Sequence, residues 1–125
     1  MEVAMELRAR IEDTERRIQR DYRKTLEKVQ KLKDQMNSLE QQAPRTSLNA
    51  LNSAIKRLNE LTDSHIMQSK KAWEEYRKLE EECKQYALRP AQLDELRVIC
   101  KKTEELAADL LCYSLARFKQ NEQQS

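Results

Sequence analysis

The feature that most constrains this chain is the complete absence of glycine over 125 residues, with proline only at positions 44 and 90. Glycine and proline supply most of the backbone conformations that tight turns need. Without them the chain has few places to reverse, so most residues must lie in a few long elements joined by short connections. Charged residues make up 37% and hydrophobic residues 38%, a balance that is typical of long helices.

Apolar residues recur at alternating spacings of three and four, which places them on one face of a helix. The first such segment spans about residues 2–43 and ends before Pro44, because the residue before a proline is pushed out of the helical conformation. A second segment spans about residues 47–88, and Thr46 or Ser47 is its expected N-cap. These two segments predict two long helices.

Pro90 separates the second segment from a third, over about residues 91–119. This proline either begins a new helix that folds back, where its missing N–H costs nothing, or kinks one continuous helix. We favour the fold-back, because helix connections of two to five residues are common. We expect residues 1–122 to form a single elongated helical domain whose polar end, 120–125, is a frayed tail.

The first two segments have matched lengths of about 60 Å, which predicts an antiparallel hairpin around Pro44. Residues whose numbers add to about 90 then lie opposite each other. The second segment has an unbroken heptad seam that weakens in its middle, where its members are Thr62, His65, Ser69 and Ala72. The seam of the first segment changes register between Ile18 and Tyr22, at the same level of the hairpin.

If the third segment folds back, its apolar stripe covers this weak stretch, with residue numbers that add to about 178. This register places Trp73 against Glu105 and Leu106, and Ile66 and Met67 against Leu111 and Cys112. We expect the seam to turn polar because the core changes there from two helices to three. The predicted fold is therefore all-α: an elongated antiparallel helical hairpin or coiled coil with a third helix, similar to a three-helix bundle.

The sequence contains none of the common catalytic motifs that we looked for in it. Phosphate loops and nucleophile elbows in their standard form need glycine, and the three cysteines form no C-x-x-C pair. His65 is the single histidine and lies about 27 Å along one helix from Cys83, too far for a catalytic dyad. We expect no enzyme activity, no cofactor and no metal, and we interpret His65 as a tolerated seam residue rather than a pH switch.

The cysteine usage bears on location. An odd number of widely spaced cysteines, with no apolar signal segment and no run approaching twenty apolar residues, indicates a reducing compartment. We expect a cytoplasmic, intracellular protein, with association with the cytoskeleton as one option.

One face of the first segment is basic, although the net charge of the chain is only +2. The basic residues that we single out are Arg20, Lys24, Lys28 and Lys31. Acidic residues of the second segment, at positions 74–82, come level with the N-terminal part of the first and neutralise it. The stripe is either a solvated helix face or a docking patch for an acidic protein surface, an anionic membrane or a nucleic-acid backbone. The lack of interleaved aromatic residues disfavours single-stranded nucleic acid.

The third segment carries an apolar stripe that is wider than one partner helix needs. The residues expected to contact a partner are Leu106, Leu110, Leu111, Leu115 and Phe118. We hypothesise a non-enzymatic coiled-coil scaffold subunit that assembles with another helical protein or with itself, in a cytoskeletal, centrosomal, kinetochore or trafficking complex. The alternative is a membrane-surface module that resembles the BAR architecture in its long helices and uses the basic face.

Overall fold

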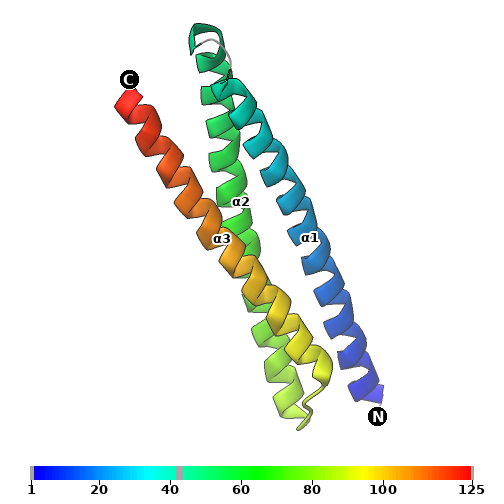
Figure 1. Ribbon diagram of the computed structural model, residues 1–125. Coiled ribbons are helices and arrows are strands. Elements are labelled where there is room, and N and C mark those ends of the chain that lie inside the picture. Colours follow the sequence, from blue (N-terminus) through cyan, green and yellow to red (C-terminus); the bar gives the residue numbers. More distant parts are fainter. Residues whose placement is uncertain (1, 42–43, 125) are drawn as a thin grey trace.

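The computed structural model describes residues 2–41 and 44–124, and it describes side chains over 2–41 and 48–117. It consists of three helices, α1 (Glu2–Glu40), α2 (Pro44–Gln85) and α3 (Ala91–Gln124). Helices α1 and α2 run antiparallel, and α3 folds back after Pro90 and packs obliquely on both (Figure 1). The predicted all-α fold and the reversal at Pro90 are confirmed.

Four helix boundaries differ from the prediction: α1 and α2 each end three residues early, at Glu40 and Gln85, α2 begins three residues early, and α3 extends beyond 119. Pro44 is the first residue of α2, a position that suits its fixed φ and missing N–H. Thr46 and Ser47 therefore lie within the first turn rather than before it, and their side chains lie outside the described residues. The polar tail that we expected to fray is helical as far as Gln124, because its glutamines and glutamate are good helix formers.

Helix α2 ends in a turn that is centred on Ala87, which has a positive φ of 55°. The N–H of Leu88 donates to the carbonyl oxygen of Cys83 at 2.8 Å, and the N–H of Ala87 donates to that of Lys84 at 3.1 Å. These two bonds form a Schellman motif, in which Leu88 also packs against the apolar core. Glycine usually occupies the left-handed position, and this glycine-free chain places its smallest residue there.

The register between α1 and α2 agrees with the prediction. Arg10 Nη2 lies 2.8 Å from Glu82 Oε2, and Arg17 pairs with Glu75. Both pairs fall within two residues of the predicted level, so the hairpin register follows from the helical period and the position of Pro44.

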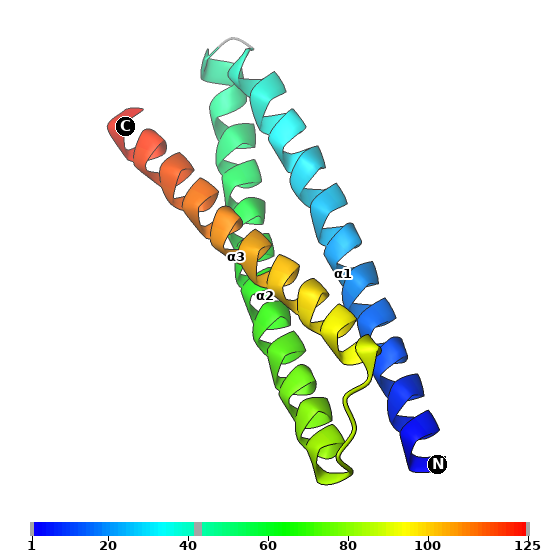
Figure 2. The same cartoon turned by 60° about the horizontal axis from the view of Figure 1, so that its bottom comes forward.

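The register between α2 and α3 differs from the prediction. The Cys100 thiol donates to the carbonyl oxygen of Ala72 at 3.5 Å, where the predicted register placed Leu106 beside Ala72. Residues 86–90 run back along α2 before α3 begins (Figure 2). Extended residues advance about 3.3 Å each against 1.5 Å in a helix, so this short linker shifts α3 along α2.

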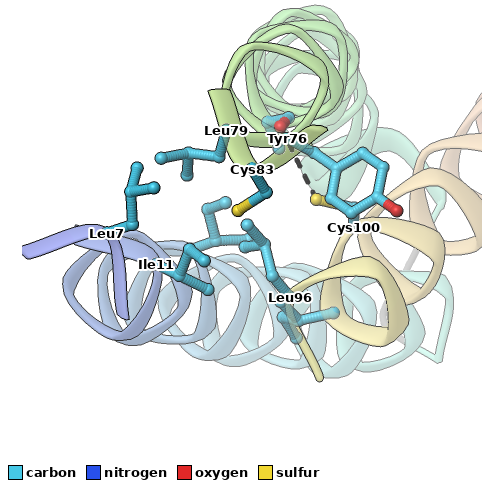
Figure 3. Close-up of a cluster of buried hydrophobic side chains, with 10 residues drawn as sticks. Leu7, Ile11, Tyr76, Leu79, Cys83, Leu96 and Cys100 are labelled. Atoms are coloured by element: carbon cyan, nitrogen blue, oxygen red, sulfur yellow. Dashed lines mark hydrogen bonds between the residues drawn. The ribbon is translucent and has the colours of Figure 1, made fainter. Parts of the chain in front are cut away.

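Two apolar clusters fill the core. The turn cluster, near the α2–α3 turn, comprises Leu7, Ile11, Ile18, Ala72, Tyr76, Leu79, Cys83, Leu96, Ile99 and Cys100 (Figure 3). The far cluster comprises Val29, Leu32, Met36, Ala54, Ile55, Leu58 and Leu110. All three helices contribute to both, but α3 supplies three buried residues to the turn cluster and only Leu110 to the far cluster.

A layer of buried polar residues separates the clusters. Its members are Thr25, Thr62, His65, Ser69 and Thr103. The three threonine hydroxyls donate to carbonyl oxygens one turn earlier in their own helices, at 2.7–3.0 Å. His65 Nε2 donates to the Thr103 carbonyl oxygen at 2.9 Å and so links α2 to α3. The expectation that the seam turns polar where two-helix packing becomes three-helix packing is wrong, because α3 packs on both sides of the layer.

Candidate interaction surfaces

The structure separates the five residues that we expected to contact a partner. Leu110 is only 2% exposed and packs in the far cluster, and Leu106 is half-buried against the same cluster. Leu111 and Leu115 are 45% and 53% exposed, one turn apart on α3. The side chain of Phe118 lies outside the described residues. Leu111 and Leu115 are therefore the exposed members of this set among the described side chains, whereas Leu110 belongs to the core and is not available to a partner.

An open groove of about 460 Å³ runs between α2 and α3 beside Leu111. Its apolar lining residues are Ile66, Trp73, Ala107, Ala108 and Leu111, and its charged ones are Lys70, Glu74, Arg77 and Glu104. Small residues form part of the lining, since Ser69 and Ala107 are both buried there. Small side chains leave room for another helix to approach closely.

The groove tests the neighbours predicted for the middle of α2. Ile66, Trp73, Glu104 and Leu111 all line this groove, but the predicted pairing does not hold residue by residue, because Cys100 takes the place beside Ala72 that was expected for Leu106. Met67, in contrast, is 64% exposed and does not face α3. Adjacent residues of a helix point about 100° apart, so Ile66 and Met67 cannot both enter one groove.

The basic stripe consists of Arg20, Lys24, Lys28 and Lys31, and all four side chains are exposed. Among the described side chains, none of the four forms an ion pair. Nearer the N-terminus, Arg10 and Arg17 pair with glutamates of α2. The predicted division of α1 into a neutralised part and an unpaired basic part is therefore present in the structure.

Buried titratable groups lie in the core rather than in a cleft. Burial raises the pKa of the Cys100 thiol to about 11, and burial also raises the pKa of Cys83. Burial, and next the hydrogen bond that its hydroxyl donates to Glu80, raise the pKa of Tyr76. Raised pKa values keep these thiols protonated, and the thiol is a much poorer nucleophile than the thiolate. Within the described residues, no three His, Cys, Asp or Glu side chains gather as a metal site.

None of the described helices combines the length and the apolar character needed to cross a membrane. Comparison with protein-family models, curated proteins and solved structures found no match. The surface features that can bind a partner are the exposed leucines of α3, the groove beside them and the basic stripe.

Proposed function

We propose that this protein is a non-enzymatic helical interaction module that packs a helix of another protein, or of a second copy, against the second half of α3. The observation that carries the proposal is the exposure of Leu111 and Leu115 beside the α2–α3 groove. Exposed apolar side chains one turn apart are the anchors that a helix-in-groove contact uses. The module would serve as a subunit of an intracellular assembly of the cytoskeletal, centrosomal, kinetochore or trafficking type.

The chemistry of the surface suits a helix as the partner. Two leucines at i and i+4 form one ridge, and the neighbouring small residues Ala107 and Ala108 leave space for a ridge of the partner. Each leucine is already about half buried, so covering the rest of its side chain stabilises a complex by about half of the roughly 1.5–3 kcal/mol that full burial contributes. Charged residues of both signs at the edge, such as Lys70 and Glu104, can select the orientation of the partner helix.

The test replaces the apolar ridge with charge through Leu111→Asp combined with Leu115→Asp. A buried carboxylate opposes association strongly, so the complex should dissociate while far-UV circular dichroism stays unchanged. The matched control is Val98→Asp, which changes another exposed apolar residue of α3 outside the surface and should leave association intact.

Two measurements read out the result. Light scattering over a range of concentrations detects self-association, and affinity purification from the native cell detects stoichiometric partners. The proposal is wrong if the wild-type chain keeps a monomer mass throughout and its set of stoichiometric partners is the same for wild type and the double variant. Loss of association in the Val98→Asp control as well would also contradict it.

A further inference from the structure

The face of the α1–α2 hairpin that α3 leaves open carries a second row of cations. On α2, Glu75 and Glu82 mark the edge that faces α1, because they pair with Arg17 and Arg10. Lys71 lies one turn before Glu75, and Arg57 lies two heptads before Lys71, so both residues follow the same edge. Both side chains are exposed.

Helix α3 does not cover this face. It reaches α1 on another side, where Lys33 Nζ lies 4.8 Å from the ring centroid of Tyr113. Lys24 is nine residues from Lys33, which is about 180° around the helix. The basic stripe of α1 therefore points away from α3.

The two rows lie at the same level of the hairpin. The Arg17–Glu75 pair fixes the register, which brings Arg20 level with Lys71 and Lys31 between Arg57 and Lys71. Each row extends over about 16–21 Å at the helical rise. Packed helix axes are about 8–10 Å apart, so the rows flank one shallow seam. We call these six residues the basic band: Arg20, Lys24, Lys28, Lys31, Arg57 and Lys71.

The basic band is not neutralised within the chain. None of its six cations forms an ion pair with another described side chain. The acidic residues interspersed along the same stretches of α1 and α2 are Asp21, Glu27, Glu60 and Asp63. The excess of cations faces water, which makes the band a surface for a negatively charged ligand.

We propose that the basic band binds an acidic segment of a partner protein, laid along the α1–α2 seam with carboxylates that reach both rows. The interspersed acids favour this occupant, because a segment can place its own charges between them whereas a continuous anionic membrane cannot. Met67, one turn from Lys71, offers a single exposed apolar contact. Membrane-surface helices instead insert several large apolar side chains, commonly Trp, Phe and Leu.

The experiment measures fluorescence anisotropy of a labelled peptide of alternating Glu and Ala with the full chain. The α1-row variant combines Lys24→Glu with Lys28→Glu, and the α2-row variant combines Arg57→Glu with Lys71→Glu. The control combines Lys101→Glu with Lys102→Glu, which changes the net charge equally through exposed residues of α3. Circular dichroism checks that every variant is folded.

We expect each row variant to weaken peptide binding about tenfold, the control to stay within about twofold of wild type, and binding to fall between about 50 mM and 300 mM NaCl. An equal loss in the control overturns the proposal, because net charge alone then accounts for binding. It is also overturned if vesicles containing phosphatidylserine co-sediment the chain in a row-dependent way while the peptide does not bind. The double Leu→Asp variant of α3 should bind the peptide normally, which separates the two proposals.

Discussion

The two halves of α3 meet the hairpin differently. The first half sends Leu96, Ile99 and Cys100 into the turn cluster, and the Thr103 carbonyl accepts the bond from His65. The second half buries Leu110 but leaves Leu111 and Leu115 about half exposed. One helix thus acts as an anchor over its first half and displays an apolar surface over its second.

The difference arises from the width of the apolar stripe. In the first half the cleft between α1 and α2 covers Leu96, Ile99 and Cys100, and Val98 stays exposed off that stripe. In the second half Leu106, Leu110 and Leu111 spread around the helix, and the far cluster takes only part of that arc. Leu110 already fills the core at this level, so Leu111 and Leu115 stay exposed and are available to bind a partner.

The largest expected effect is the difference in unfolding free energy between truncating a leucine in the first half of α3 and truncating one in the second half. Leu96→Ala removes a fully buried side chain and should lower the free energy of unfolding by roughly 2–5 kcal/mol. Leu115→Ala should change it by no more than about 0.5 kcal/mol. Urea denaturation followed by circular dichroism measures both. Equal losses would show that the second half is as firmly packed as the first.

Alkaline pH should weaken the packing of Cys100, which lies in the first half of α3. The pKa of Cys100 is about 11 in the folded chain, above its ordinary value, so the unfolded state loses this proton first as the pH rises. The contribution of Cys100 to stability is then fully present below about pH 9 and falls by about 1 kcal/mol per unit between pH 9 and pH 11. Cys100→Ala should reduce that slope, whereas Cys112→Ala, at an exposed site, should leave it unchanged. A slope that is the same in both variants would contradict the assignment to Cys100.

Replacing an alanine by glycine should have opposite effects at two positions: it should stabilise the turn before α3 and destabilise the second half of α3. Ala87→Gly relieves a positive φ and should raise the free energy of unfolding by about 0.5–1 kcal/mol. Ala108→Gly, in the middle of α3, should lower it by a similar amount. Thermal melts compare the two variants, and a destabilising Ala87→Gly would argue against the Schellman turn.

The smallest effects concern two ion pairs that join different helices. Arg117 pairs with Glu40 and stacks 5.3 Å from the ring centroid of Tyr113, so Arg117→Gln should lower the free energy of unfolding by about 0.5–1 kcal/mol. Arg17→Gln removes only the pair with Glu75 and should cost less than about 0.5 kcal/mol. Denaturation at low and high salt measures both. The opposite ranking would mean that polar contacts do not hold the second half of α3 to α1.

Much of the hairpin is predictable from the residues alone. The helical period selects the buried faces of α1 and α2, and Pro44 locates their reversal, so Arg17 and Glu75 meet within two residues of the expected level. The basic stripe is equally visible, because its members recur at helical spacing. Lys71 belongs to the same surface because it lies one turn before Glu75. Its spacing in the sequence predicts this only once it is known which edge of α2 faces α1.

The path of residues 86–90 and the choice between neighbouring leucines depend on tertiary packing. A five-residue linker can return along α2 or extend past it, and the left-handed Ala87 selects the return, which shifts α3 against α2. Leu110 and Leu111 are chemically identical and adjacent in sequence, yet one is core and the other surface. Periodicity defines a stripe on a helix, but only the position of neighbouring helices determines which edge of that stripe remains exposed.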